Sequence, residues 1–313
     1  MAKNLIQKKN TSARKTKNVK MLIIHSFFIL VSLAFIIPFI YTISVSFSNE
    51  KDIADLGYKI IPVHFDLTAY RYVFKNPQKI IDAYTVTASQ ALLGTVLSTL
   101  IMSMCAYPLS RRIFKFRSII IYFVLFTMFF GAGSVPTPPS YILISKYLKL
   151  SNSFMVYIIP SLVGAFNILI FITFFKGLPE SLIESAKIDG ANELFVYYKI
   201  IVPLSKPVIA SIAFILLLGR WNDYITSLIY ITNPRLLTLQ YLLQKILWEA
   251  DFLKNLTENS PTGIVMDVYN KNDLPLETMT FAMCIIAAGP MLVVFPFFQK
   301  YFAKGLIVGA VKG

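Results

Sequence analysis

Two short stretches concentrate the polar and charged residues that lie among long apolar segments. The stretch ESAKIDGANELFVYYKIIVPLSKP, Glu184 to Pro207, places six charged residues, two prolines and a central glycine between two apolar runs. The other stretch carries five consecutive polar or aromatic residues inside an apolar run: Arg220, Trp221, Asn222, Asp223 and Tyr224. The first stretch is suited to contact with another protein, whereas the second offers the hydrogen bonds and the stacking surface that a sugar needs.

No pattern for covalent or hydrolytic catalysis occurs in the sequence. The G-x-x-x-x-G-K-[ST] phosphate loop is absent, so any coupling to ATP by that mechanism must come from a partner. HExxH, CxxC and G-x-S-x-G are absent too, and the two histidines, His25 and His64, lie in different segments. We therefore expect no catalytic residue, no metal site and no cofactor bound directly by this chain.

The composition indicates a membrane protein. Hydrophobic residues make up 56% of the 313 residues, charged residues only 15%, and the mean hydropathy is +0.64. Six apolar segments predict transmembrane helices: Met21 to Phe47, Tyr84 to Leu109, Ser118 to Val135, Phe154 to Phe175, Val208 to Ile231 and Met279 to Phe302. We expect an all-α integral membrane protein in which residues 21–302 form one six-span unit.

Lysine and arginine residues concentrate on one set of the predicted loops. They are dense in the N-terminal tail (1–20), between Arg111 and Arg117, in the loop 177–207 and near the C-terminal tail (303–313). The positive-inside rule places these four segments, and hence both termini, in the cytoplasm. The net charge of +14 then reflects the orientation of the chain in the membrane and not binding to nucleic acid. We therefore expect a lipid bilayer, and no nucleic acid, as partner.

Two other segments have compositions that bear on where they lie relative to the membrane. GAGSVPTPPSYILISKYLKL, residues 131–150, has two glycines and three prolines. It is either a re-entrant or kinked segment that faces the protein interior, or an external turn with an interfacial helix. The external loop 232–278 begins with helical apolar spacing and then becomes polar, so it is either a solvated connector or a docking surface for a protein outside the membrane.

The loop 177–207 predicts two helices joined by a glycine. Ser181 and Glu184 have capping-box spacing, so a first helix can begin near Ser181. Gly190 can end that helix in the left-handed conformation, and Asn192 is a good N-cap for the second helix. The second helix is expected to carry one apolar stripe: Leu194, Phe195, Tyr198 and Ile201. This element either transmits a displacement from a soluble partner to the neighbouring spans or lies on the lipid headgroups.

The same stretch resembles the EAA motif of ABC-importer permeases, E-A-A-x3-G-x9-I-x-L-P. Glu184-Ser-Ala-Lys-Ile-Asp-Gly190 is followed, after nine residues, by Ile200-Ile-Val-Pro203. Ser185 stands for an alanine of the motif and Val202 for its leucine, and both exchanges are small. GAGSVPT, PLSKP and the terminal VKG resemble the carbohydrate-uptake branch of the MalG and LplC type, and the resemblance covers all six predicted spans.

The resemblance implies the type I ABC importer permease fold, with cytoplasmic coupling helices that sit in a cleft of an ATPase subunit. The residues expected to couple to the ATPase are Glu184, Ser185, Ala186, Asp189, Gly190, Ala191, Phe195 and Pro203. The implied partners are a second permease in a heterodimer, an ATPase dimer that holds ATP and Mg, and an extracellular substrate-binding protein that could contact the loop 232–278.

The resemblance leaves open whether Arg220 contacts solute. This residue falls past the midplane of the predicted fifth span, where an isolated arginine costs on the order of 2.5 to 3.5 kcal/mol, so it must face protein or water. It either forms a structural pair with Asp223 or with the partner permease, or it lines a substrate path with Trp221, Asn222, Asp223 and Tyr224.

We expect a multi-pass permease subunit in the bacterial cytoplasmic membrane that serves import of a sugar or oligosaccharide. One alternative is the same assembly for a different solute, such as a peptide or glycerol phosphate. Another is an autonomous secondary transporter, for which Asp223 and His25 are the only intramembrane relay candidates. A structural membrane scaffold is disfavoured by the interrupted third span and the coupling loop.

Overall fold

The computed structural model describes residues 2–130, 137–259 and 275–310. These residues are helices and connecting segments, and their only extended pairing is one isolated bridge between Ser48 and Phe65. The chain divides into two compact units, and each is described by itself. Unit 1 comprises Met1–Val73 and Leu253–Ile285, and unit 2 comprises Phe74–Phe252 and Ile286–Gly313.

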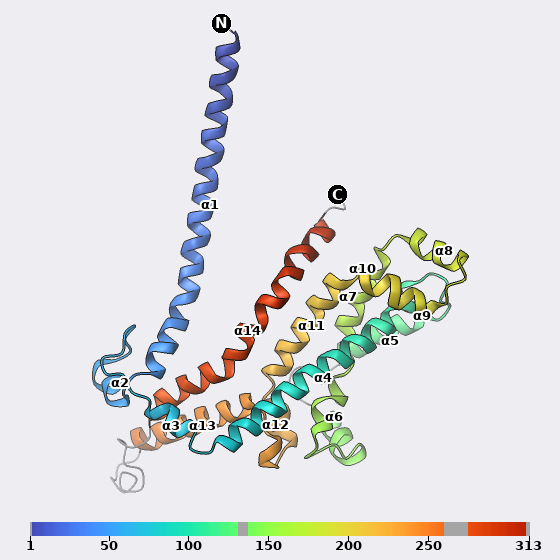
Figure 1. Cartoon of the computed structure of the whole chain (residues 1–313). Coiled ribbons are helices and arrows are strands. Elements are labelled where there is room, and N and C mark those ends of the chain that lie inside the picture. Colours follow the sequence, from blue (N-terminus) through green and yellow to red (C-terminus); the bar gives the residue numbers. More distant parts are fainter. Residues whose placement is uncertain (1, 131–136, 260–274, 311–313) are drawn as a thin grey trace. The chain divides into compact units, whose positions relative to one another are not determined.

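Unit 1 is built around the long helix α1 (Ala2–Ser46), the short helices α2 (Glu50–Leu56) and α3 (Thr68–Val73), and the first part of α14 (Leu276–Ala310) (Figure 1). A carboxylate far away in the sequence caps the start of α14. Glu50 accepts hydrogen bonds from the backbone N–H groups of Glu277 (2.9 Å) and Thr278 (3.0 Å). Since the first N–H groups of a helix lack partners within it, this contact fixes α14 to the start of α2.

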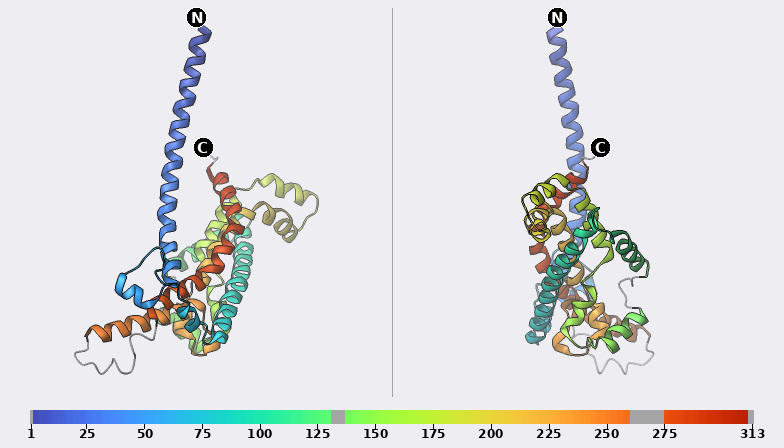
Figure 2. Two further views of the ribbon diagram at one scale, coloured as in Figure 1. Left: turned by 60° about the vertical axis from the view of Figure 1, so that its left-hand side comes forward. Right: turned by 90° about the vertical axis from the view of Figure 1, so that its right-hand side faces the viewer.

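Helix α4 (Pro77–Ser110) is the central element of unit 2. Helices α7 (Ala165–Lys176) and α11 (Lys206–Trp221) lie against it in every view (Figures 1 and 2). Small side chains recur every three or four residues on its buried face, which allows this close approach: Ala83, Thr87, Ala91, Gly94 and Ser98.

The other elements of unit 2 connect these helices or extend from them. In chain order they are α5 (Arg117–Phe130), α6 (Pro138–Ile142), η1 (Leu143–Tyr147), η2 (Phe154–Tyr157), η3 (Ile159–Ser161), α8 (Glu180–Ile188), α9 (Glu193–Val196), η4 (Tyr197–Ile201), α10 (Val202–Leu204), α12 (Ile225–Tyr230), η5 (Pro234–Leu236) and α13 (Leu239–Asn259). Helix α13 is the amphipathic helix that the first half of the loop 232–278 predicts; residues 260–274 of that loop lie outside the described residues.

Length and apolar composition identify three membrane-crossing helices among the described residues: Met21–Ser46 within α1, α4, and Leu276–Tyr301 within α14. Two bent pairs raise this number to as many as five: Phe154–Ser161 with Ala165–Lys176 (48°), and Glu193–Leu204 with Lys206–Trp221 (80°). Helix α5 is apolar but short. In the glycine- and proline-rich segment 131–150, residues 131–136 lie outside the described residues, and the rest forms the short elements α6 and η1. Six spans therefore stay a prediction.

The fourth and fifth predicted spans are not continuous helices. The fourth consists of η2 and η3, a break at residues 162–164, and then α7. The fifth ends as α11 at Trp221 and resumes as α12 at Ile225. Short polar side chains explain the second break, because the Asp223 carboxylate accepts a hydrogen bond from the Thr226 N–H (3.0 Å) and so caps the new helix.

Candidate coupling and solute-path sites

The turn between α8 and α9 follows the predicted local geometry. Gly190 has a φ of +80°, the left-handed conformation expected of it. The N–H of Gly190 bonds the Lys187 carbonyl (3.0 Å) and the N–H of Ala191 bonds the Ala186 carbonyl (2.9 Å), which together form a Schellman motif. The Asn192 side chain accepts from the Phe195 N–H at 2.7 Å, so its predicted N-cap role is confirmed.

Helix α8 begins near Ser181 as predicted, but its N-cap and the apolar stripe differ from the prediction. Helix α8 begins at Glu180 after Pro179, so Ser181 lies inside the helix and not at its N-cap. In the second helix, Leu194, Phe195 and Tyr198 are exposed whereas Ile201 is fully buried. The cause is the π-helical turn η4, because its extra residue per turn rotates the following side chains away from α-helical register.

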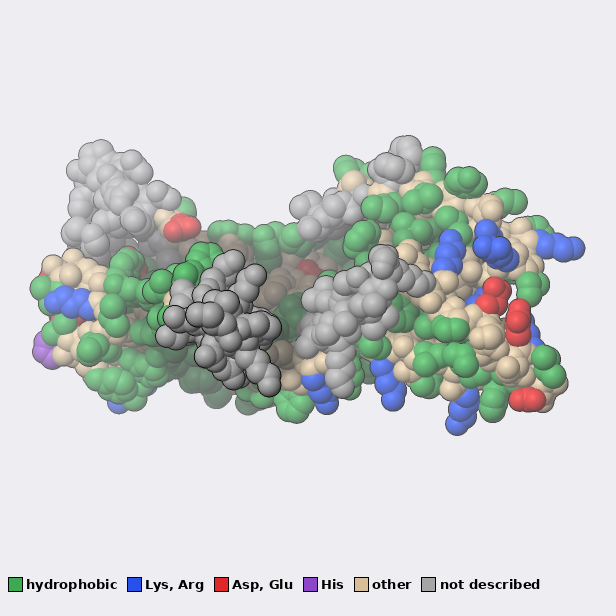
Figure 3. Space-filling model, turned by 90° about the horizontal axis from the view of Figure 1, so that it is seen from above, with side chains coloured by type: hydrophobic (Ala, Val, Ile, Leu, Met, Phe, Trp, Pro, Cys, Tyr) green, Lys and Arg blue, Asp and Glu red, His purple; other side chains and the backbone are tan. Residues whose placement is uncertain are grey.

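The outer surface of α8 and α9 carries large apolar side chains that no described residue covers. Ile188 is 86% exposed, Leu194 61% and Phe195 51%. Most residues expected to couple to the ATPase are exposed as well: Glu184, Ser185, Asp189, Gly190, Phe195 and Pro203. Ala186 and Ala191 are half-buried and pack against the core. Figure 3 shows Lys, Arg, Asp and Glu among hydrophobic side chains at the end of unit 2 that carries α8.

The inner surface of the same element is fixed to α4 and α7. Ile183 of α8, Val196 of α9 and Tyr197 of η4 are buried in one core cluster with Ala106 of α4 and Phe175 of α7. Because protein cores are close-packed, a displacement of α8 or α9 must be transmitted to the helices behind them.

Three polar contacts support this packing. Tyr107 of α4 donates to the Glu193 carboxylate (2.7 Å), and Lys187 of α8 forms an ion pair with the same carboxylate (2.5 Å). Ser103 of α4 and Tyr197 share a buried hydrogen bond of 2.7 Å. Glu193 thus links α8, α9 and α4. The sequence alone did not single out Tyr107 or Glu193, because 86 residues separate them along the chain.

The charge of Glu193 depends on these neighbours. The hydrogen bond from Lys187 is the main cause of a pKa below the usual value for glutamate, partial burial opposes it, and the bond from Tyr107 adds to the lowering. The Glu193 side chain is 60% exposed, at the start of α9 and ahead of the bend at Lys206.

Arg220 is almost fully buried, at 7% exposure, and its two Nη groups donate within unit 2, whereas its Nε has no hydrogen-bond partner among the described residues. Nη1 donates to the Tyr157 carbonyl (2.9 Å), and Nη2 donates to the Ser98 hydroxyl (2.7 Å) and the Ser161 carbonyl (3.0 Å). The guanidinium thus joins α11 to α4, η2 and η3. Its contacts in the described part of the chain include no ion pair with Asp223, whose carboxylate instead caps α12.

A cavity of about 390 Å³ lies beside Arg220. It is lined by Tyr157, Ser161, Gly219, Arg220, Asn222, Asp223, Tyr224 and Ile225. Four of the five residues predicted for the substrate path therefore meet at one cavity, which also receives Tyr157 and Ser161 from the interrupted fourth segment. Sequence reasoning missed these two because they stand in an apolar run that looks like a continuous helix.

Trp221 does not line this cavity. Its indole is 6% exposed and donates to the Ala287 carbonyl of α14 at 2.9 Å. The exposed aromatic group beside Tyr224 is Trp248 of α13, whose ring centroid lies 6.4 Å from that of Tyr224 in an edge-on arrangement. Trp248, 41% exposed, is free to offer the aromatic face that the sequence suggested for Trp221.

The described residues contain no group of three or more His, Cys, Asp or Glu side chains that could hold a metal ion. Residues 90–308 match the family described as binding-protein-dependent transport system inner membrane component. This range is more than half of the chain and includes both sites described above. The chain belongs to this family.

Relatives of this family member are permeases of carbohydrate uptake, as the motif resemblance predicted. The chain is 35% identical over 292 residues to the polygalacturonan/rhamnogalacturonan transport system permease protein YtcP of Bacillus subtilis (strain 168), covering 93% of this chain and 98% of the relative. It is 38% identical over 279 residues to Protein LplC of the same organism, covering 89% and 90%. The resemblance to carbohydrate-uptake ABC permeases is confirmed.

A solved structure has the same fold. The crystal structure of a bacterial ABC transporter involved in the import of the acidic polysaccharide alginate superimposes on this chain with a TM-score of 0.74 and 26% sequence identity. The match covers 92% of this chain and 98% of that chain. This chain therefore has the fold of an ABC importer permease over almost its whole length.

Proposed function

We propose that this chain is a permease subunit of an ATP-driven, binding-protein-dependent importer for a sugar or oligosaccharide. The observation that carries the proposal is the two-sided element α8 and α9, with an exposed apolar outer surface and an inner surface packed on the spans. Such an element can receive a soluble partner on one side and move membrane helices on the other. A cytoplasmic ATPase dimer, which would hold ATP and Mg, is the proposed partner.

Glu184 to Pro203 would form the contact with the ATPase. The Schellman turn at Gly190 sets the angle between α8 and α9, and Glu193 holds both helices against α4. When the ATPase subunits close, the displacement passes through Ile183 and Val196 into α4 and α7. The expected result is alternation between outward and inward access, with both termini in the cytoplasm and a second permease completing the path.

The cavity beside Arg220 is the proposed solute contact of this subunit. Asn222, Asp223 and Ser161 provide short polar groups, and Tyr224 with Trp248 provides an aromatic edge and face. Sugars are bound by this combination of hydrogen bonds and stacking. The names of the relatives favour a carbohydrate; the same assembly with a non-sugar solute is the alternative.

The assembly can be tested by gentle solubilisation of the protein from its native membrane and mass spectrometry of what copurifies. We expect a second multi-span permease and an ATPase subunit in stoichiometric amounts. A chain that purifies alone or as a homodimer, with uptake that does not respond to ATP, would favour the secondary-transporter alternative instead.

Replacing Trp248 with alanine should weaken solute recognition. Loss of one stacking face costs about 0.5 to 1.5 kcal/mol, so KM for uptake should rise about two- to twelvefold while the amount of inserted protein stays the same. Phe252, an exposed aromatic residue one turn later on α13, is the matched control. An unchanged KM in Trp248→Ala, or an equal rise in Phe252→Ala, would remove Trp248 from the proposed path.

Replacing Glu193 with glutamine should weaken coupling. The amide cannot pair with Lys187 as a carboxylate does, and the bond from Tyr107 loses its charge assistance, each effect being worth about 1 kcal/mol. We expect more ATP hydrolysed per solute imported in proteoliposomes. Tyr107→Phe should shift the ratio in the same direction, whereas Glu249→Gln, in an exposed pair with Lys245, should leave it unchanged.

A further inference from the structure

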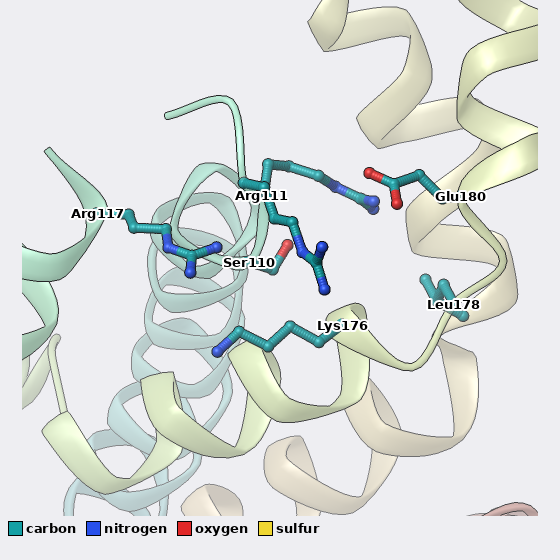
Figure 4. Close-up of a pocket in the computed structure, with 7 residues that line it drawn as sticks. Ser110, Arg111, Arg117, Lys176, Leu178 and Glu180 are labelled. Carbon is teal, nitrogen blue, oxygen red and sulfur yellow. The ribbon is translucent and has the colours of Figure 1, made fainter. Parts of the chain in front are cut away.

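A second cavity lies where α4 and α7 end and where α5 and α8 begin. Its volume is about 250 Å³, and it is lined by Ser110, Arg111, Arg112, Arg117, Lys176, Leu178 and Glu180. Figure 4 shows the side chains of Arg117, Lys176 and Glu180, which come from three different helices, around one shared space. This cavity is separate from the solute cavity at Arg220, and the proposed function assigns it no role.

The cavity carries an excess of positive charge. Four of its seven lining residues are cationic and only Glu180 is acidic. None of the four cations takes part in an ion pair in the described part of the chain. Among the described residues, the Nε and Nη2 atoms of Arg111 are buried and have no hydrogen-bond partner, although the guanidinium lies 5.3 Å from the Tyr107 ring centroid. Buried donors of this kind are costly unless a partner satisfies them.

The helix ends do not account for this charge. The carboxyl ends of α4 and α7 attract cations with a dipole equivalent to about half a charge each, but the amino end of α5 opposes them. Within the described residues, the Nε and Nη2 atoms of Arg111 donate to no terminal carbonyl. A net positive cavity therefore remains, and its chemistry fits a phosphate group bound by several guanidinium donors.

The surrounding surface indicates where that phosphate comes from. Exposed apolar side chains alternate with the cations in the segment RRIFKFR: Ile113 is 79% exposed and Phe116 is 62% exposed. Ile119 on the first turn of α5 is exposed too. A soluble phosphate would not need this apolar rim, whereas a lipid would place its acyl chains against it and its headgroup in the cavity.

We propose that the cavity formed by Arg111, Arg112, Arg117 and Lys176 binds the phosphate headgroup of an anionic phospholipid from the cytoplasmic leaflet. Basic pockets between transmembrane helices on this side are suited to such headgroups. Glu180 is the first residue of α8, so a lipid held there lies directly beside the start of the proposed coupling element. The site rests on the proposed orientation of the chain and not on the identity of its solute.

The test uses the complete transporter complex in nanodiscs of phosphatidylcholine with a graded fraction of phosphatidylglycerol. Native mass spectrometry should show at least one phosphatidylglycerol retained per copy of this chain. Arg112→Gln with Lys176→Gln changes only exposed side chains, so the fold should persist while affinity for the retained lipid falls about tenfold. The control removes two charges elsewhere, Lys146→Gln with Lys149→Gln, and should retain the lipid as the wild type does.

A change of the opposite sign gives a second arm. Glu180→Gln removes the single carboxylate of the cavity and should increase retention of phosphatidylglycerol several-fold. Equal retention in the wild type, the double variant and Glu180→Gln would overturn the proposal. Inorganic phosphate is also added to the complex in pure phosphatidylcholine nanodiscs. If it binds there as tightly as phosphatidylglycerol does, the occupant is a soluble phosphate and the lipid proposal is overturned. If the double variant loses the ATPase subunit but retains the lipid, the cavity is a contact with that protein, and the proposal is overturned.

Discussion

Replacing Gly190 with valine is expected to reduce solute uptake by at least tenfold while the protein still inserts and assembles. Gly190 has a φ of +80°, and a Cβ placed there would meet no atom of the described residues within 4 Å. The effect must therefore come from the backbone and not from crowding. A left-handed conformation costs an ordinary residue about 1 to 2 kcal/mol, and a β-branched residue more, so the chain should leave it.

The consequence of leaving that conformation is local. The N–H of Ala191 would lose its bond to the Ala186 carbonyl, and α8 would change its angle to α9. Because the outer surfaces of both helices are proposed to fit one cleft of the ATPase, that contact should weaken. We expect the rate of ATP hydrolysis to become independent of solute, measured in proteoliposomes alongside uptake.

Two controls separate strain from other causes. Gly190→Asn should be much milder, because asparagine tolerates the left-handed region. Gly57 has a φ of +72° and a ψ of −175°, a conformation that is almost restricted to glycine, and a Cβ there would meet no described atom within 4 Å, so Gly57→Val imposes at least as much backbone strain in the other unit. Uptake should survive that change. Full uptake in Gly190→Val would count against the coupling role of the turn.

The parts of the structure that follow local rules could be predicted from the sequence. Gly190 and Asn192 act within a few residues of themselves, so their conformation and capping follow from residue type alone. The apolar stripe at Leu194 to Ile201 failed because the sequence gives no local sign of a π-helical turn. Six apolar segments could be counted from the sequence, but the breaks within two of them could not. In the fourth segment α7 begins after Gly164, and in the fifth α12 is capped by the Asp223 carboxylate.

The candidate sites depend more on tertiary contacts. Arg220, Asn222, Asp223 and Tyr224 line one cavity, as could be expected of residues that are consecutive or nearly so, and their role in a substrate path stays a prediction. The sequence could not show that Trp221 is buried and that Trp248 lies exposed beside Tyr224, because this depends on the position of α13. Nor could it find the contact of Tyr107 with Glu193, or that of Arg220 with Ser98, because each joins helices far apart in the chain.

Replacing Arg220 with alanine is expected to lower both stability and uptake strongly. The change leaves the Tyr157 and Ser161 carbonyls without their donor in a buried setting, at about 1 to 3 kcal/mol for each unsatisfied group. Thermal unfolding of the solubilised complex should occur at a lower temperature, and uptake should fall about tenfold or more. Arg220→Lys should recover only part of this, because an ammonium group cannot reach all three acceptors as the guanidinium fork does.

Gly94 of α4 provides the means to separate a structural role from solute contact. A Cβ on Gly94 would lie 2.3 Å from Nη1 of Arg220, so Gly94→Ala alone should displace the guanidinium and lower the unfolding temperature. With Arg220→Ala in the same chain, that crowding is gone, and the double variant should be more stable than the two single losses added together predict. Additive losses in unfolding temperature would mean that the two residues do not meet as described. Competition among sugars for uptake separates the two roles of Arg220. A changed order of preference in Arg220→Ala supports contact with the solute. A uniform loss for every sugar is expected if Arg220 only joins α11 to α4 and η2, because these contacts set the shape of the whole cavity.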